Sequence, residues 1–335
     1  MVVGRGAGAG LWRDGRGAGL AEYILVVGLV ALVAMVGFRT FGSSVSAKAD
    51  AQADCITDFE VCVGNPQGAD GTHGGKPMVG DKNPKFIDVD AAKDAVSTKA
   101  EGTPFIDGGD GRPVHPSDLS QGQLGDCYFV ATLAALAHSK PGAIEQGIKD
   151  NGDGTFTVTF YDRGILGTDT VKIKVTPEFP YKDGRWVFIK PGDTDGTKSE
   201  LWPMLYEKAY AQWKGGYKAI GGGGSPDDVM SAITGQSSSW NRTSGLVWDM
   251  SFSDFADKFA GNVTVAATQG KDGAKGKAVF EDGRLVANHA YWVESVDRDK
   301  QTVTVRNPWG WGEKPVTLSW DDFKQGFGTV YTTKK

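Results

Sequence analysis

The sequence lacks basic runs beyond its N-terminal segment, and it has slightly more acidic than basic residues. It contains 36 lysines and arginines against 41 aspartates and glutamates, which gives a formal net charge of −5 at pH 7. A nucleic-acid-binding surface needs clustered positive charge, so the composition excludes nucleic acid as an expected partner. With 335 residues, 40% of them hydrophobic, the chain is long enough for one large core or for two lobes.

Long hydrophobic runs are also scarce. The run Ile24–Phe38 is shorter than the roughly 20 residues that a membrane-spanning helix needs. Counting from Leu20 to Phe41 brings it into that range. Three arginines lie before the run. Their position predicts that the N-terminal side stays in the cytoplasm and that the residues after 42 lie outside.

The flank of this run carries a pattern in which Gly17 is followed five residues later by Glu22 and a tyrosine. Over about residues 15–42 it resembles Flp-type (type IVb) pilin precursors and other class III signal peptides. The resemblance implies cleavage after Gly17 and assembly of residues 18–42 into a membrane or a pilus-like structure. Two alternatives stay open, an uncleaved signal anchor and a secretory signal cut near Ala47–Ala49. In all three cases we expect a membrane-anchored or secreted protein whose main domain leaves the cytoplasm.

Cysteine is rare, with three in the whole chain. Cys55 and Cys62 lie just beyond the apolar run, where an oxidising compartment allows them to close a small disulfide loop. The alternatives are a metal pair or two inert thiols. Metal is the weaker of these, because only His73 lies near enough in sequence to add a ligand. The third cysteine, Cys127, stands alone and must stay reduced if it is to react.

The stretch QGQLGDCYFVATLAAL, residues 121–136, delivers this lone cysteine to the start of an apolar helix that we expect over about 127–138. Unpaired N–H groups at a helix start stabilise negative charge, so they favour the nucleophilic thiolate. The side-chain amide of Gln121 and the backbone N–H of Cys127 would form a two-donor oxyanion hole. We expect the neighbouring Asp126 to point away and to act as a first-turn charge that complements the helix dipole.

His289 and Asn307 supply the groups that activate such a cysteine. A general base must reach the sulfur, and a third group must hold the imidazole in the useful tautomer. Both residues lie at the edges of alternating apolar segments, 291–296 and 302–305, which predict paired strands. Trp309 follows Asn307 by two residues, where its ring can cover the histidine–asparagine hydrogen bond and exclude water from it.

Together these residues carry a family resemblance. QGQLGDCYF, EKAYAQW, NHAYWV and RNPWG resemble, in this order, the catalytic core of the calpain family of papain-like cysteine proteases, over about residues 112–330. The resemblance implies that Cys127 is the nucleophile and His289 the general base and acid. It also implies that Asn307 orients the histidine and that Gln121 is the oxyanion donor.

The resemblance further implies an α+β, papain-like fold, with a helical lobe that carries the cysteine and a β-rich lobe that carries the histidine and asparagine. One N-terminal apolar helix would precede it. Tyr128 stands where the family usually has Trp, and Asn288 where it usually has Gly. The expected divisions are a basic leader (1–17), a pilin-like transmembrane or signal helix (18–42), a spacer or propeptide (43–111), the cysteine lobe (112–224) and the histidine and asparagine lobe (225–335).

Local patterns add detail to this plan. Residues 155–161 and 170–175 alternate between apolar and polar side chains, which predicts a hairpin. Helical spacing of apolar residues over 200–213 predicts a helix. Four consecutive glycines, 221–224, predict a hinge between the lobes. Within the spacer, residues 88–100 carry a brief helical pattern.

Calcium is the one cofactor that the resemblance implies, and we expect no organic cofactor. Calpains use an acidic residue nine positions before the nucleophile and another at the start of the EKAYA helix, which here are Asp118 and Glu200. Carboxylates with backbone carbonyls suit calcium. Asp193 and Asp195 lie near enough in sequence to add ligands. The alternative is that Asp118 caps a turn and Glu200 a helix start.

Two functional hypotheses from different classes follow. The first is an exported or membrane-tethered calpain-like cysteine endopeptidase that hydrolyses protein or peptide substrates through a Cys-His-Asn triad, with calcium as a candidate requirement. The alternative is a pilin-like structural or adhesive surface subunit that displays a protease-fold domain. The complete set of Gln121, Cys127, His289 and Asn307 favours the enzyme. A transglutaminase-type acyl transferase is weaker, because those enzymes usually pair His with Asp and lack QGxxGDC.

Overall fold

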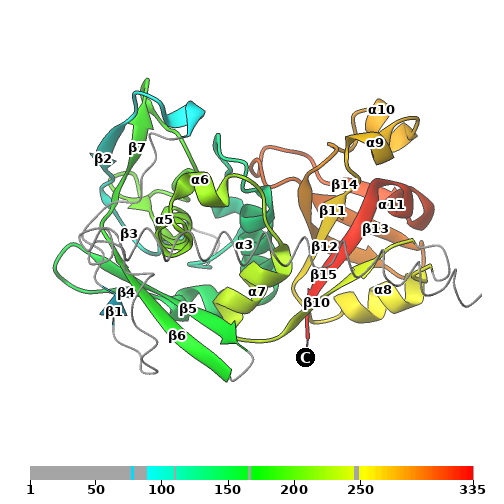
Figure 1. The fold of residues 1–335 in the computed structure, drawn as a ribbon, viewed down its shortest axis with the longest axis horizontal. Coiled ribbons are helices and arrows are strands. Elements are labelled where there is room, and N and C mark those ends of the chain that lie inside the picture. The colour runs from blue at the N-terminus through cyan, green and yellow to red at the C-terminus, as the bar shows by residue number, and fades with distance from the viewer. Residues whose placement is uncertain (1–76, 79–88, 109–110, 165–166, 245–248, 335) are drawn as a thin grey trace, which may run out of the picture. The chain divides into compact units, whose positions relative to one another are not determined.

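The computed structural model describes residues 77–78, 89–108, 111–164, 167–244 and 249–334. These residues form a mixed α+β fold (Figure 1), with two clusters of buried apolar side chains. The larger cluster surrounds the two long helices α3 (Cys127–Ser139) and α5 (Trp202–Lys214). The smaller one lies between a six-stranded sheet and the short helices beside it. The predicted α+β class is confirmed.

Helix α3 is apolar on all sides, and the ten consecutive residues Tyr128–Ala137 are buried. A helix of this kind belongs in the middle of a core. It ends where Pro141, which begins the next helix, cannot continue it. Helix α5 has a proline in its first turn and ends at Gly215, whose φ is 96°. Both predicted helices are confirmed, each within two residues of its expected start.

Shorter helices connect and cover these elements. They are η1 (Asp90–Ala92), η2 (Pro116–Asp118), α4 (Pro141–Gly147), α6 (Tyr217–Ile220), α7 (Pro226–Thr234), α8 (Phe252–Phe259), α9 (Lys271–Ala274), α10 (Ala278–Glu281) and α11 (Trp320–Gly326).

The predicted hairpin is formed by β5 (Phe156–Gly164) and β6 (Gly167–Val175), which pair in antiparallel register with Val158 opposite Ile173. Strand β4 (Ile148–Asp150) pairs with the other edge of β5, and β1 (Pro77–Met78) runs parallel to β6. Buried side chains alternate along the first half of β5, so one face of this sheet packs on the larger cluster.

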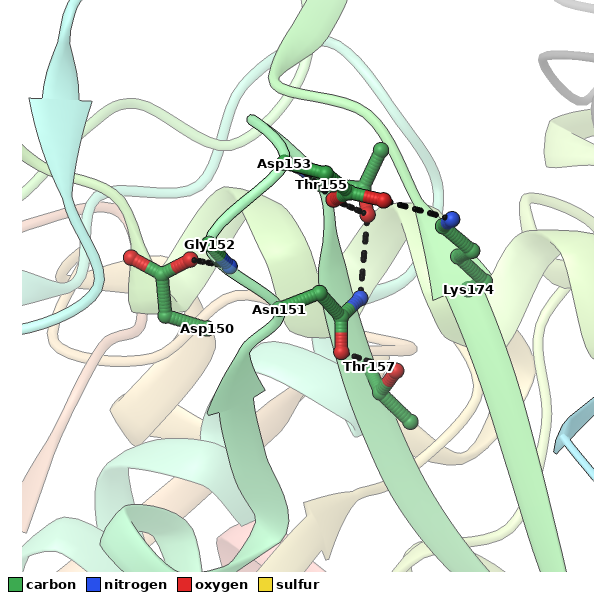
Figure 2. A network of polar contacts seen from close by, with 7 residues as sticks. All are labelled: Asp150, Asn151, Gly152, Asp153, Thr155, Thr157 and Lys174. Carbon is green, nitrogen blue, oxygen red and sulfur yellow. Dashed lines mark hydrogen bonds and ion pairs between the residues drawn. The ribbon is translucent and has the colours of Figure 1, made fainter.

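Polar side chains stabilise the turn between β4 and β5 (Figure 2). Asp150 accepts a hydrogen bond from the Gly152 N–H at 2.8 Å, and Asp153 accepts one from the Thr155 N–H at 3.0 Å. Lys174 on β6 forms an ion pair with Asp153 at 2.9 Å. Asp side chains that bond backbone groups two residues on are typical of tight turns. These polar contacts hold the turn at this end of the hairpin.

The second lobe is built on an antiparallel sheet in the order β10-β15-β11-β12-β13-β14. Its strands are β10 (Ser238–Arg242), β11 (Thr264–Thr268), β12 (Ala290–Asp297), β13 (Thr302–Arg306), β14 (Val316–Ser319) and β15 (Phe327–Thr333). Strands β12 and β13 are the predicted pair, with Val293 opposite Val305. Because His289 directly precedes β12 and Asn307 directly follows β13, the pairing brings both to one edge of the sheet.

Residues before 112 take part in the fold of the first lobe. Strand β2 (Val96–Lys99) pairs with β7 (Glu178–Lys182), which continues to β8 (Arg185–Trp186). Strand β3 (Gly102–Thr103) pairs with β9 (Ser199–Glu200). The predicted helix over 88–100 is therefore wrong except for the short η1. An available edge on β7 recruits the segment as a strand, and this distant pairing outweighs a weak local helical pattern.

The backbone of the four glycines 221–224 packs closely against side chains at the start of α3 and in the loop before it. A Cβ on Gly221 would lie 2.5 Å from the Leu124 side chain, and one on Gly224 would lie 2.4 Å from the Tyr128 ring. Helix α7, which the sequence assigned to the second lobe, contributes Val229, Met230 and Ile233 to the larger cluster beside α3 and β5. The apolar cluster of the second lobe begins later, at α8.

The basic leader, the predicted pilin-like helix and the cysteine pair Cys55 and Cys62 lie outside the described residues. Within the described ranges, we find no helix with the length and apolar character needed to cross a bilayer. Cys127 is a free thiol.

Candidate active site

A cleft of about 730 Å³ is lined by residues of both lobes. One wall is the loop Gln121–Gly125 with Cys127 at the start of α3, and the opposite wall includes His289 and Trp309. The glycines 221–224 also line it. Four of the predicted catalytic residues therefore meet in one cavity, although they are separated by up to 188 positions in the sequence (309 − 121).

Cys127 is the first residue of α3, and its thiol is partly buried. Hydrogen bonds from the backbone of Ala290, Tyr128 and Cys127 itself favour the thiolate, in the direction predicted for a helix start. Burial acts in the opposite direction and is the larger effect, so the pKa of Cys127 is raised above its ordinary value. The helix start alone does not ionise the thiol, and a base has to take its proton.

His289 has the geometry that such a base requires. Its side chain is 9% exposed, and its Nε2 lies 2.9 Å from Oδ1 of Asn307. An amide oxygen only accepts hydrogen bonds, so Nε2 carries the hydrogen and Nδ1 keeps a free lone pair. Burial lowers the pKa of His289, and the bond to Asn307 opposes this shift. The imidazole is therefore held neutral, in the tautomer that can accept a proton at Nδ1.

The residue before the histidine adopts an unusual backbone conformation. Asn288 has a φ of 57°, in the left-handed region, and its N–H donates to the Gln269 carbonyl at 2.8 Å. Asparagine tolerates this region better than other residues with side chains. This explains why Asn is accepted at a position where the resembling family usually has Gly.

Trp309 lies beside the imidazole, with its ring centroid 5.2 Å from that of His289. Its backbone N–H donates to Asn307 Oδ1 at 3.2 Å. The amide oxygen of Asn307 thus accepts two hydrogen bonds, one from the histidine and one from the backbone, which fixes its orientation. The indole remains 45% exposed on its outer side.

The loop Pro308–Trp311 also joins the two lobes, which sequence reasoning missed. The Pro308 carbonyl accepts the Gln121 N–H at 3.0 Å, and the Trp309 carbonyl accepts the Ser120 hydroxyl at 3.0 Å. The Trp311 ring lies 5.3 Å from the ring of His115 in the first lobe. In the sequence, only the Trp-Gly-Trp run, with two large aromatic side chains in one loop, indicates that this loop contacts another part of the fold.

The side chain of Gln121 is held by its own loop. Its Nε2 donates to the Leu124 carbonyl at 2.9 Å and to Asp126 Oδ1 at 3.2 Å, while its Oε1 is buried and has no partner among the described residues. The prediction for Asp126 is wrong, because its carboxyl is 0% exposed. The aspartate points inward to Gln121 because the tight Gly122–Gly125 turn folds the loop back over the start of α3.

Asp118 and Glu200, the predicted calcium ligands, are both buried, at 4% and 0% exposure. They meet at Gly192, where a Cβ would lie 2.4 Å from Glu200 Oε2 and 2.8 Å from the Asp118 Cβ. Burial, with a further contribution from the charge of Asp118, raises the pKa of Glu200 to about 8. Two close, buried carboxyls of this kind form a site whose charge suits a divalent cation.

Hydrogen bonds to these carboxyls bear on the alternatives. Asp118 closes a capping box with His115 at the start of η2, as the capping alternative predicts. Glu200 lies in β9 and does not cap α5; it accepts the N–H of Ile106 at 2.9 Å. Asp195 is exposed and accepts bonds within its own turn. Over the described ranges no group of three acidic, histidine or cysteine side chains is arranged as a metal site, so any further ligands would be other oxygen donors such as backbone carbonyls and water.

Comparison with known proteins identifies relatives of this chain. A family profile described as calpain family cysteine protease matches residues 105–335. The chain is similar to the calpain-2 catalytic subunit of Bos taurus, with 28% identity over 237 residues, and to calpain-8 of Mus musculus, with 26% identity over 242 residues. These alignments cover 68% and 69% of this chain but 32% of each relative. The chain therefore spans about a third of the length of the curated relatives it matches.

Proposed function

This chain belongs to the calpain family of cysteine proteases, and we propose that it is an endopeptidase with Cys127, His289 and Asn307 as its catalytic triad. One observation carries most of the weight. The imidazole of His289, oriented by Asn307 through Nε2, lies in the same cleft as the thiol at the start of α3. Protein or peptide chains are the proposed substrates.

In the proposed reaction, His289 Nδ1 takes the thiol proton and the Cys127 sulfur attacks the carbonyl carbon of the peptide bond. The carbonyl oxygen becomes negative and accepts hydrogen bonds from the Cys127 N–H and from Gln121 Nε2, which exchanges its 3.2 Å bond to Asp126 Oδ1 for one to the oxyanion. When the C–N bond breaks, His289 gives its proton to the leaving amine and a thioester remains. A water molecule gives a proton to His289 and attacks the thioester. The acid product leaves, and the proton returns to sulfur.

Calcium binding at Asp118 and Glu200 is part of the proposal. The supporting observation is the burial of two mutually repelling carboxyls at Gly192. A bound calcium ion would supply positive charge that keeps both carboxylates ionised. It would thereby link the end of η2, at Asp118, to β9, which contains Glu200.

The nucleophile can be tested by covalent labelling. We expect the full chain to react with an epoxide probe for thiol proteases at Cys127, as located by mass spectrometry, and the Cys127→Ala variant not to react. Labelling is measured in calcium and in chelator, with Glu200→Gln as the matched variant. Labelling that needs calcium in the parent chain and is lost in Glu200→Gln supports the calcium site. Labelling that is the same with and without calcium contradicts regulation by calcium and is still consistent with the protease assignment.

A folded chain that never labels would contradict the triad. The alternative, a pilin-like surface subunit that displays this domain, would then be the better interpretation.

The pH dependence of kcat/KM follows from the two pKa shifts. The active Cys127–His289 pair holds one proton. Protonation of His289 at low pH removes the base, and loss of the remaining proton at high pH removes the acid. Because burial lowers the pKa of His289, the acid limb should lie below the ordinary pKa of an imidazole. Because burial raises the pKa of Cys127, the alkaline limb should lie above that of a free thiol. Hydrolysis of a peptide substrate from about pH 4 to 10, with folding monitored by circular dichroism, measures both limbs. A pH range of full activity that is narrower than the interval between the ordinary pKa values of imidazole and a free thiol contradicts the assignment.

We also propose that the catalytic domain works outside the cytoplasm, either anchored or released. This proposal is supported only by the sequence of residues 18–42 and the three arginines before it, since these residues lie outside the described part of the chain.

A further inference from the structure

Thr268 lies at the end of β11, where its side chain and its backbone both bond the residue proposed as the general base. Its hydroxyl accepts a hydrogen bond from the His289 N–H at 2.9 Å. The same hydroxyl donates to the Val286 carbonyl at 2.8 Å, and the His289 carbonyl lies 3.0 Å from it as a second acceptor. The Thr268 N–H donates to the His289 carbonyl at 2.9 Å. One threonine therefore bonds both backbone groups of the histidine.

These bonds replace part of a regular strand ladder. Strands β11 and β12 pair in antiparallel register up to Ala267 and Ala290, so Thr268 and His289 are the next opposite residues. In a regular ladder, a hydrogen-bonded pair exchanges two backbone bonds. Here one backbone bond is made, and the threonine hydroxyl is the acceptor for the His289 N–H. The ladder ends at this point because Asn288, with a φ of 57°, leaves the extended conformation.

A second hydroxyl holds the segment that leads to the base. The Val286 N–H donates to the Tyr291 hydroxyl at 3.0 Å, and Tyr291 is buried. Val286 is thus bonded at its carbonyl by Thr268 and at its N–H by Tyr291. The Tyr291 ring also meets the His289 ring edge to face, with the centroids 5.2 Å apart. The backbone around the base is therefore held by side chains from two neighbouring strands.

The position of this backbone matters because the imidazole has two partners. His289 Nε2 lies 2.9 Å from Asn307 Oδ1, and the Cys127 thiol lines the same cleft. The direction of the Cα–Cβ bond of His289 decides whether the ring can serve both. A buried N–H without an acceptor is costly, so removal of the threonine oxygen would make the local backbone shift toward another acceptor.

We propose that Thr268 is a positioning residue for His289. The inference rests on the proposed function, in which His289 is the general base, and adds a residue that acts on the base through its backbone. The Thr268 hydroxyl fixes this backbone, which in turn aims the imidazole at Asn307 and Cys127. The role needs an oxygen at this place. Serine supplies one, and valine, which has nearly the shape of threonine, does not.

Kinetics of substituted full chains test the role of the hydroxyl. We expect Thr268→Val to lower kcat by about 10²-fold, the effect of a catalytic group misplaced by about 1 Å, with KM changed by less than about threefold. Thr268→Ser should keep kcat within about threefold of the parent chain, because it retains the oxygen. Equal losses in the two variants would overturn the proposal. Since Thr268 also lines the cleft, a change confined to KM would indicate a substrate contact and would overturn the positioning role.

Thr264→Val is the matched control. Thr264 lies on the same strand, is 1% exposed, and donates its hydroxyl hydrogen to the Asn262 carbonyl at 3.4 Å. It is not among the described residues that line the cleft, so kcat should stay within about twofold of the parent chain even if stability to denaturant falls. Comparable losses of kcat in Thr264→Val and Thr268→Val would mean that weakening of β11 causes both, and would overturn the proposal. If Thr268→Val does not fold, Thr268→Ala, which also lacks the hydroxyl, takes its place.

NMR spectroscopy separates this inference from the proposed function, because it needs no turnover. The Nε2 proton of His289, donated to Asn307, should give an imidazole N–H resonance in the parent chain, assigned by its loss in His289→Ala. Thr268→Val should shift this resonance or speed its exchange with water, Thr268→Ser should restore it, and Thr264→Val should leave it in place. An inactive chain that shows these signals would refute the protease mechanism and retain the positioning role. A resonance unchanged in Thr268→Val would overturn the role whatever the activity.

Discussion

His289→Ala should lower kcat by about 10⁴-fold, the usual effect of losing a member of a catalytic triad. Burial raises the pKa of Cys127 despite the backbone hydrogen bonds around the sulfur. The thiol therefore needs an external base to form the nucleophile, and the leaving amine needs a proton that no other group in the described cleft is oriented to give. Steady-state hydrolysis of a peptide substrate measures the loss.

His138→Ala is the matched control for this substitution. His138 is a surface histidine at the far end of α3 whose pKa is also lowered by desolvation, and its ring lies 5.2 Å from that of Trp292. It is outside the cleft lining, so kcat should change by less than about threefold. Comparable losses in the two variants would mean that the effect comes from packing at α3 and would remove the general-base assignment from His289.

Gly122→Ala should both destabilise the first lobe and reduce activity. A Cβ at this position would lie 2.0 Å from the Phe188 carbonyl oxygen and 2.5 Å from that of Val187. These are backbone atoms, so neither can rotate away. The loop has to move, which breaks the Gln123 N–H bond to the Val187 carbonyl, 2.8 Å long, and displaces Gln121 from the cleft wall. We expect a loss of about 1–3 kcal/mol in the free energy of unfolding and about 10²-fold in kcat.

Denaturant unfolding and peptide hydrolysis measure these two effects, and Gly142→Ala provides the comparison. In α4 a Cβ on Gly142 would meet only the flexible Gln146 amide at 3.6 Å. This alanine should be neutral or stabilise the fold by up to about 1 kcal/mol, because it restricts the unfolded chain. If Gly122→Ala were equally harmless, the close approach of the loop to residues 187–188 would not be required for activity.

Elements with strong local patterns were predictable from the sequence. A continuous apolar run predicts helix α3, and alternation of apolar and polar residues predicts β12 and β13. The three catalytic candidates could therefore be located before their contacts were known. The position of His289 next to Asn307 follows directly, since each residue adjoins an end of two strands that pair. Patterns of this kind depend only on neighbouring residues.

What could not be predicted depends on distant contacts. Residues 96–99 form strand β2 because β7 offers an edge about 80 residues later, with Val96 opposite Tyr181 and Lys99 opposite Glu178. Asp126 is buried at the start of α3, because the fold of the first lobe covers it there. Nothing near either position in the sequence indicates the distant strand partner or this burial. The raised pKa of Cys127 has the same origin, since the burial of its thiol depends on tertiary packing that the local sequence does not encode.

The loop Pro308–Trp311 gives the cleft a mechanical property. The same few residues bond the first lobe, through the carbonyls of Pro308 and Trp309, and hold Asn307, through the Trp309 N–H. Separating the lobes would pull on the loop and so disturb the amide oxygen that orients His289. Separation of the lobes would therefore also disturb the hydrogen bond that orients His289. We expect a chain with an open cleft to be inactive for this reason, even when no inhibitor occupies the cleft.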